Sequence, residues 1–137
     1  METEGIFAPD SRAGARERYA TLAPVAAEVV RAVTREMDFD GAEYDRRVTA
    51  EVERAAQDAI FASLLEVRWG PRAAFDEWRT DYAGDLKLLG SDNVDNVVWH
   101  AGPDGAAVAA TFQGEREAAV GTLRRQAFGS IYSEVVR

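Results

Sequence analysis

Residues 96–113, NVVWHAGPDGAAVAATFQ, decide the fold because they place two apolar runs around a tight turn. Pro103 and Asp104 suit the centre of a type I turn, with Gly105 in the left-handed conformation after it. Counting outward from this turn sets the register of an antiparallel hairpin. The predicted pairs are Asn96 with Phe112, Val97 with Thr111, Val98 with Ala110, Trp99 with Ala109 and His100 with Val108.

His100 is the only histidine, and its place beside Trp99 suggests a ligand-binding or catalytic residue. The register separates the two rings, because neighbouring residues of a strand face opposite sides of the sheet. A general base needs a carboxylate near one ring nitrogen, but Asp95 is about 16 Å away along the strand. His100 is therefore either a packed histidine bonded to a carbonyl or a ligand-binding residue whose partner comes from a distant helix.

The N-terminal half has the spacing of helices. Asp10 and Ser11 can cap a first helix that runs to about Ala20, and Pro24 suits the first turn of a second helix. In that second helix, apolar residues recur every three or four positions, so we expect this stripe to face the core. The stripe consists of Leu22, Val25, Val29, Val33 and Met37.

Four carboxylates within residues 38–45 resemble a calcium loop, but the pattern fails. Glycine comes too early, and the twelfth position from Asp38 is Thr49 rather than glutamate. Asp40 and Glu43 instead have the spacing of a capping box. The stretch predicts the beginning of a long helix and no metal site.

The remaining segments complete an α+β pattern. Residues 64–69, LLEVRW, alternate as a half-buried strand does, although they could also end the preceding helix. Residues 85–90 predict a short strand, and a long C-terminal helix begins near Gly114. The predicted fold is α+β, with a helical N-terminal half and a small, mainly antiparallel sheet of three to four strands that includes the 96–113 hairpin. No linker divides the chain, so we expect one domain over residues 1–137, with residues 1–9 a candidate loose segment.

A second candidate site is a polar cluster near the end of the hairpin. The register brings the loop before the first hairpin strand close to the start of the last helix. The cluster could bind a cation, or it could be a solvated turn whose acids favour a helix N-terminus. Its members are Asp92, Asp95, Gln113, Glu115 and Glu117.

Composition excludes several classes of protein. The chain has no cysteine, a net charge of −8 and 47% hydrophobic residues, and 15 of its 16 basic residues are arginine. Thiol chemistry is excluded, and the acidic balance disfavours nucleic-acid binding, although arginine patches formed in three dimensions stay a third hypothesis. No apolar run approaches a membrane span, and the N-terminus lacks the apolar region of a signal peptide. We therefore expect a cytoplasmic protein without membrane association, metal or cofactor, and the excess of acids and arginine predicts a salt-adapted cytosol.

Four stretches carry a resemblance to a known family: GIFAPDSR (5–12), FASLL (61–65), NVVWHA (96–101) and ATFQGEREAAVGTLRRQAFG (110–129). The chain resembles a family of short uncharacterised proteins from haloarchaea, known as a domain of unknown function. The resemblance implies a salt-loving archaeal cytosol and transfers no functional residue.

Two functions follow as hypotheses. Catalytic motifs are missing from the sequence, so the first is a non-enzymatic module that binds a protein partner or a further copy of itself. The second is an enzyme or small-ligand-binding protein with a pocket that includes His100.

Overall fold

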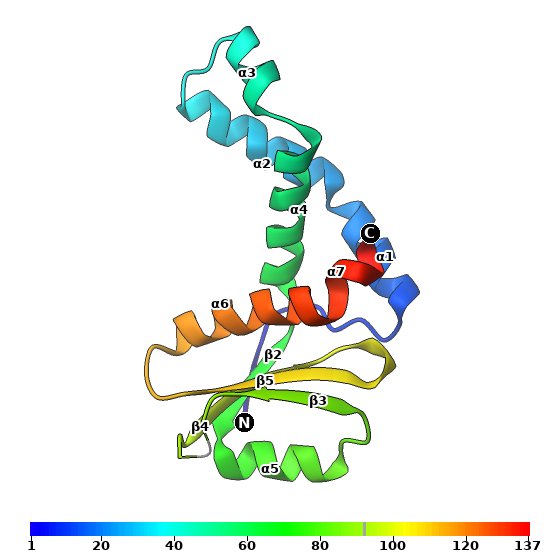
Figure 1. The fold of residues 1–137 in the computed structure, drawn as a ribbon, viewed down its shortest axis with the longest axis vertical. Helices are drawn as coiled ribbons and strands as arrows, with labels where there is room; N and C mark the ends of the chain where they lie inside the picture. Colours follow the sequence, from blue (N-terminus) through cyan, green and yellow to red (C-terminus); the bar gives the residue numbers. More distant parts are fainter. Residues whose placement is uncertain (92) are drawn as a thin grey trace.

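The computed structural model describes residues 1–91 and 93–137, and a helical arm extends from its five-stranded sheet (Figure 1). The strands lie in the order β1-β2-β4-β5-β3. β3 runs parallel to β5, and the other neighbouring pairs are antiparallel. Their bounds are β1 Glu2–Glu4, β2 Val67–Pro71, β3 Asp85–Leu89, β4 Asn96–Ala101 and β5 Ala106–Phe112.

The β4–β5 hairpin confirms the register predicted from its turn. All five predicted pairs occur, and the Gly102 N–H donates to the Ala106 carbonyl at 2.7 Å. The predicted type I turn is wrong, because Asp104 itself is left-handed, with φ 60°. Aspartate tolerates this conformation better than most residues. The register is unaffected, since the turn still contains three residues, Pro103–Gly105.

The overall α+β class is confirmed, but the sheet is larger and more mixed than predicted. Residues 2–7, within the candidate loose segment, run along the sheet: β1 pairs with β2, and the Glu66 N–H donates to the Phe7 carbonyl at 2.7 Å. β2 occupies the free edge of β4. β3 therefore joins the outer edge of β5, where the chain direction makes the pairing parallel. Sequence spacing shows strands but not which edge each one takes.

The helices begin largely where their caps predict. Ser11 caps the first by accepting from the Gly14 N–H at 3.0 Å, and Asp40 caps the third by accepting from the Glu43 N–H at 2.8 Å. Both readings of residues 64–69 are found in part: Leu64 is the last residue of a helix, and Val67 begins β2. The helices are α1 Arg12–Thr21, α2 Ala23–Glu36, α3 Gly41–Arg47, α4 Ala50–Leu64, α5 Arg72–Asp81, α6 Arg116–Ala127 and α7 Ser133–Val136.

The long helix predicted from Asp40 is wrong, because α3 ends after two turns. Val48 is extended, and the Thr49 side chain accepts from the Val52 N–H at 3.3 Å to cap a new helix, α4. The helical spacing of apolar residues continues across Thr49, but the cap at this residue divides the one predicted helix into two.

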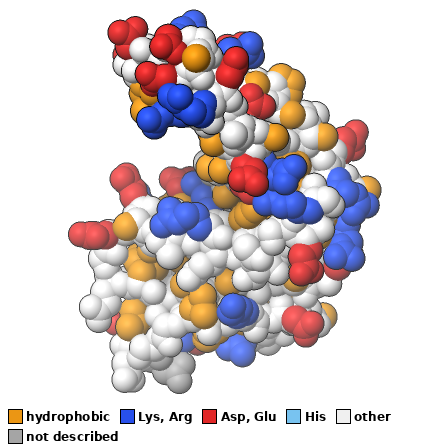
Figure 2. Space-filling view, turned by 45° about the horizontal axis from the view of Figure 1, so that its top comes forward, with side chains coloured by type: hydrophobic (Ala, Val, Ile, Leu, Met, Phe, Trp, Pro, Cys, Tyr) orange, Lys and Arg blue, Asp and Glu red, His pale blue; other side chains and the backbone are white. Residues whose placement is uncertain are grey.

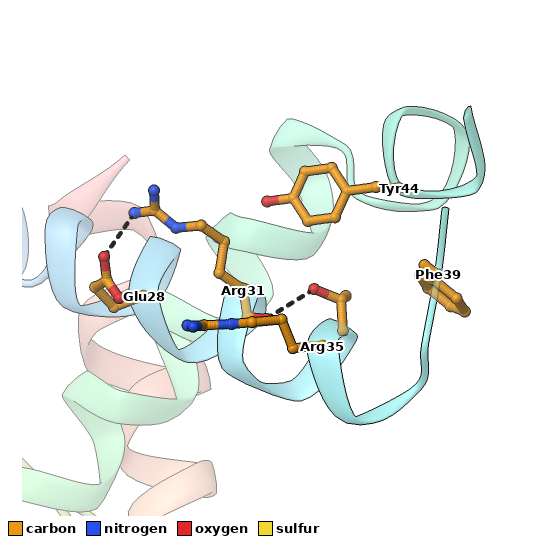
Figure 3. A pocket seen from close by; sticks show the side chains of 6 residues that line it. Glu28, Arg31, Arg35, Phe39 and Tyr44 are labelled. Carbon is orange, nitrogen blue, oxygen red and sulfur yellow. Dashed lines mark hydrogen bonds and ion pairs between the residues drawn. The ribbon is translucent and has the colours of Figure 1, made fainter. Parts of the chain in front are cut away.

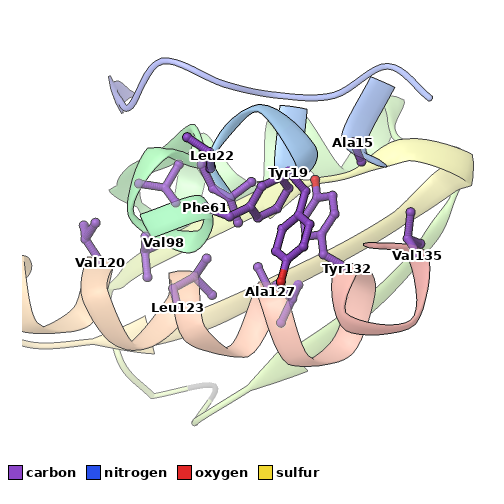
Figure 4. Close-up of a cluster of buried hydrophobic side chains, with 13 residues drawn as sticks. Ala15, Tyr19, Leu22, Phe61, Val98, Val120, Leu123, Ala127, Tyr132 and Val135 are labelled. Carbon is purple, nitrogen blue, oxygen red and sulfur yellow. The ribbon is translucent and has the colours of Figure 1, made fainter. Parts of the chain in front are cut away.

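The main core lies on the face of the sheet that α6 covers (Figure 4). Phe61 of α4 is its centre, and four rings pack edge-on against it with centroids 5.2–5.8 Å away. These rings belong to Phe7, Tyr19, Phe128 and Tyr132. Because aromatic side chains bury large areas, they compensate for the many alanines of this core.

The opposite face of the sheet has a second, smaller core under α5. Side chains along β4 alternate between the two faces of the sheet. Val97 and Trp99 lie in this smaller core against Phe75 of α5, while Val98 and His100 face the main core. Trp99 and His100 therefore lie on opposite faces, as the hairpin register predicted. Both faces of the sheet are covered.

The apolar stripe of α2 does not face the core, contrary to the prediction. Leu22, at the cap before α2, is buried, but the other four members of the stripe are exposed. α2 packs along α4 and buries Ala26, Val30 and Thr34 instead. These three residues also recur every four positions, so periodicity alone could not choose between the two stripes.

Candidate functional site

His100 is held between two buried hydrogen-bonding partners. Its Nδ1 lies 2.6 Å from the Glu66 carbonyl oxygen, and its Nε2 lies 2.6 Å from the Tyr132 hydroxyl. A carbonyl can only accept, so Nδ1 carries the proton and Tyr132 donates to Nε2. His100 is 2% exposed and Tyr132 0%, so a ligand could reach this histidine only by breaking one of these bonds.

The surroundings favour the neutral imidazole. Burial lowers the pKa of His100 below its ordinary 6.5, and nearby Arg124 and Arg68 act in the same direction against the hydrogen bond to Glu66. Burial raises the pKa of Tyr132, which keeps the hydroxyl protonated as a donor. Through these two hydrogen bonds, His100 joins β4 to Tyr132 near the C-terminus and to Glu66 in the link between α4 and β2.

The position of Tyr132 depends on a break in helical period. Between α6 and α7, residues Phe128–Tyr132 form a π-helical segment, which adds one residue to the turn. Tyr132 consequently takes the buried position that a regular helix would give to Ile131, which is only partly buried. Tyr132, one of the two partners of His100, therefore lies in the helical segment near the C-terminus, at a position that regular helical spacing would not turn toward the core.

The described members of the predicted polar cluster lie at one end of the β4–β5 hairpin and at the start of α6. Asn96 pairs with Phe112, so Asp95 and Gln113 flank that pair at the end of the hairpin. Glu115 precedes α6 and Glu117 lies in its first turn. Asp92 lies outside the described residues. Among the residues that the structure describes, no group of three or more His, Asp or Glu side chains could hold a metal ion.

Arg72 donates hydrogen bonds to backbone carbonyls in the loop between β3 and β4, which contains Asp95. Its guanidinium donates to the carbonyls of Ser91 at 3.0 Å and Val94 at 3.1 Å, and its backbone N–H donates to the Asp95 carbonyl at 2.6 Å. The Thr111 hydroxyl accepts from the Ser91 N–H at 3.1 Å. These bonds order the loop through its backbone rather than through its acids.

Several exposed large hydrophobic residues lie on the arm, which comprises α2, α3 and the adjoining part of α4. Figure 1 shows α2 and α3 far from the sheet. Four large apolar side chains, which we call the valine ridge, recur every four residues along α2 and point into solvent. They are Val25, Val29, Val33 and Met37, exposed by 46%, 42%, 54% and 57%. Figure 2 shows hydrophobic side chains on the flank of the arm, beside its charged tip.

A cleft of about 680 Å³ opens on the other side of α2, between this helix and α3 (Figure 3). Arg31 in the cleft pairs with Glu28 at 3.0 Å. In the described part of the chain, Arg35 has no carboxylate within ion-pair distance. Its Nε donates one long hydrogen bond, of 3.4 Å, to the Arg31 carbonyl. Tyr44 of α3 and Phe39 complete the wall. The cleft therefore holds the guanidinium group of Arg35 on the side of α2 that faces away from the valine ridge.

Within the described residues, no helix is long and apolar enough to cross a membrane. A family of unknown function, DUF5809, matches residues 6–133, which is nearly the whole chain. The chain belongs to the DUF5809 family. No curated protein and no solved structure matches this DUF5809 chain. Membership carries no activity and no site residues, so the geometry is the only guide to function.

Sequence reasoning missed the valine ridge because it assigned the same residues to the core. A signal was present nonetheless. Ala26 and Val30 extend the apolar arc of α2 well beyond the width that one neighbouring helix can cover. A helix with too much apolar surface for one partner points to a second contact.

Proposed function

We propose that this DUF5809 protein is a non-enzymatic interaction module whose docking surface is the valine ridge of α2. The observation that supports it is the exposure of four large apolar side chains at helical spacing on an arm that the sheet does not cover. Monomeric soluble proteins rarely expose contiguous apolar patches of more than a few hundred Å², and larger patches mark interaction sites.

The magnitude is sufficient for recognition. The four exposed fractions together equal about two fully exposed side chains. Complete burial of one such side chain stabilises by about 1.5–3 kcal/mol, so covering the ridge contributes about 3–6 kcal/mol from one surface. A matching apolar surface on the partner contributes a comparable amount, against an association cost of about 4–15 kcal/mol. We therefore expect a reversible contact of moderate affinity.

Recognition by the ridge uses ordinary helix packing. Residues four apart form a continuous row on a helix surface, and such a row fits between the rows of a facing helix. All four residues of the row are exposed, and Figure 1 shows that α2 lies away from the sheet, so a partner helix could lie along the row. The alternative hypothesis, a ligand pocket that includes His100, requires a ligand to displace the Tyr132 hydroxyl or the Glu66 carbonyl.

Site-specific photo-cross-linking in living cells tests the proposed surface. A photoreactive amino acid replaces Ala32, which is exposed and lies beside Val29 on the helix surface. The matched control replaces Ala73, an exposed alanine of α5. We expect a discrete adduct from position 32 and none from position 73. Absence of an adduct at position 32, or equal adducts at both positions, would contradict the proposal.

A further inference from the structure

The cleft between α2 and α3, which we call the arm cleft, has two walls of different chemistry. Glu28, Arg31 and Arg35 lie on one wall, since helical residues three, four and seven positions apart share a face. Phe39 and Tyr44 lie on the other wall, in the link before α3 and in α3 itself (Figure 3). The volume of about 680 Å³ suits a small organic molecule. The complete lining is Glu28, Arg31, Thr34, Arg35, Phe39 and Tyr44.

The lining of the arm cleft is positively charged, although the chain as a whole carries −8. Two guanidinium groups, of Arg31 and Arg35, line it together with one carboxylate, that of Glu28. None of the described acids within residues 36–45 belongs to the lining. The local excess of positive charge therefore favours an anion over a cation as the occupant.

Both guanidinium groups keep hydrogen-bond donors for a ligand. A guanidinium has five N–H donors. Arg31 pairs with Glu28 through Nη2 at 3.0 Å, and Arg35 donates only from Nε, in the long bond to the Arg31 carbonyl. Within the described residues, the two terminal nitrogens of Arg35 have no carboxylate partner. The Thr34 hydroxyl, by contrast, is already bonded to carbonyls of α2. The planar end of Arg35 therefore matches the two oxygens of a carboxylate or phosphate group.

The aromatic wall offers a surface to a flat ring. Figure 3 shows the Tyr44 side chain extending from α3 with its hydroxyl end toward the side where Arg31 lies. The Arg47 guanidinium lies 5.4 Å from the centre of the Phe39 ring, a cation–π contact that helps to hold this ring in place. Both rings are partly buried. Because an exposed ion pair alone contributes little free energy, contact between rings has to supply much of the affinity.

We infer that the arm cleft binds a small organic anion in which a phosphate or carboxylate group is attached to a flat ring. The oxyanion accepts hydrogen bonds from Arg35 and from the remaining donors of Arg31, and the ring packs against Phe39 and Tyr44. This inference goes beyond the proposed function, because the cleft lies on the side of α2 that faces away from the valine ridge. Each of the two sites stands or fails without the other.

Titration of the isotope-labelled chain followed by two-dimensional NMR tests the inference, because the amide shifts report binding residue by residue. Adenosine monophosphate and benzoate are the main probes, since each joins an oxyanion to a ring. Adenosine has the ring alone, and inorganic phosphate has the anion alone. Ionic strength is held constant, because salt screens exposed charges. We expect one or both main probes to shift the amides of residues 31–44 to saturation, and adenosine and phosphate to bind at least about tenfold more weakly.

Substitutions of Arg35 locate the binding. Arg35→Gln changes an exposed side chain, so it should leave the fold intact and weaken binding of the effective probe by about tenfold. Arg35→Lys keeps the charge but loses the planar pair of donors, and it should restore only part of the affinity. The matched control is Arg16→Gln at an exposed position of α1, which makes the same change of charge outside the cleft and should bind as the wild type does.

The other outcomes are equally definite. If neither adenosine monophosphate nor benzoate shifts the amides of the cleft, the inference is wrong. Phosphate that binds as tightly as adenosine monophosphate would reveal a bare anion site, and adenosine that binds as tightly would reveal a site for the ring alone; either result overturns the inference. An unchanged affinity in Arg35→Gln, or an equal loss in Arg16→Gln, overturns it as well. A response to only one of the two main probes supports the inference and identifies the oxyanion.

Discussion

Replacing Tyr132 by phenylalanine isolates the hydrogen bond that fixes His100. The substitution removes one oxygen atom from a fully buried side chain, so it changes packing little while deleting the donor to Nε2 at 2.6 Å. His100 keeps its bond from Nδ1 to the Glu66 carbonyl and stays in place. Its Nε2 lone pair then remains buried without a partner, and such a group costs about 1–3 kcal/mol. We expect the free energy of unfolding to fall by that amount.

Equilibrium urea unfolding measures the effect, at about pH 8, where free histidine is neutral. The measurement is made at low protein concentration, so that contacts between molecules do not contribute to stability. Tyr82→Phe is the matched control, because its hydroxyl makes only a long, exposed bond to the Asp85 carbonyl at 3.3 Å. The control should change stability by less than about 0.5 kcal/mol. If Tyr132→Phe is equally silent, the buried pair does not hold β4 to the C-terminal segment.

Three further predictions concern pH and backbone. Burial lowers the pKa of His100 in the folded state, so the unfolded chain binds a proton at a higher pH than the folded chain does. The free energy of unfolding should therefore fall as the pH drops below about 6.5. In a profile of stability against pH, His100→Gln should flatten this part of the curve. Burial alone would raise the pKa of Asp58, but hydrogen bonds from Arg137 and Tyr19 outweigh this effect and lower the pKa below 3.8. The ionised Asp58 carboxylate therefore stabilises the fold above about pH 3.8, and this contribution is lost at lower pH. In acid titrations followed by circular dichroism, Asp58→Asn should be less stable than wild type near neutrality and should converge with it at low pH. Gly90→Ala should lower the melting temperature by several degrees, because Gly90 has φ 106° and an added Cβ would collide with the Thr111 hydroxyl; an unchanged melting temperature would show that this turn relaxes freely.

The hairpin could be predicted from sequence because its register depends only on local turn chemistry. Once GPDG marks the turn, the two-residue period of strands fixes every pair from Asn96 to His100. The position of β3 was not accessible in the same way. It depends on β2 having taken the free edge of β4, which is a contact between segments distant in sequence.

The candidate site residues show the same difference between what local sequence patterns predict and what depends on contacts between distant segments. His100 was placed on the correct face of the sheet, but its partner Tyr132 was missed because the π-helical segment shifts the C-terminal period by one residue. The valine ridge was found as a stripe and assigned to the wrong environment. Periodicity shows that a helix has an apolar face, whereas the choice between core and partner depends on how much surface its neighbours cover.

Methionine oxidation measures coverage of the valine ridge most directly. The chain has two methionines, both exposed in the structure: Met37 in the ridge at 57% and Met1 outside it at 62%. Exposed methionine is readily converted to sulfoxide, so mild peroxide followed by mass spectrometry reports the oxidation rate of each side chain. We predict that Met37 is oxidised more slowly relative to Met1 in living cells than in the dilute purified chain, and that Val29→Asp with Val33→Asp removes this protection. A ratio of the two rates that is the same in cells and in the dilute purified chain would contradict a ridge that a partner covers.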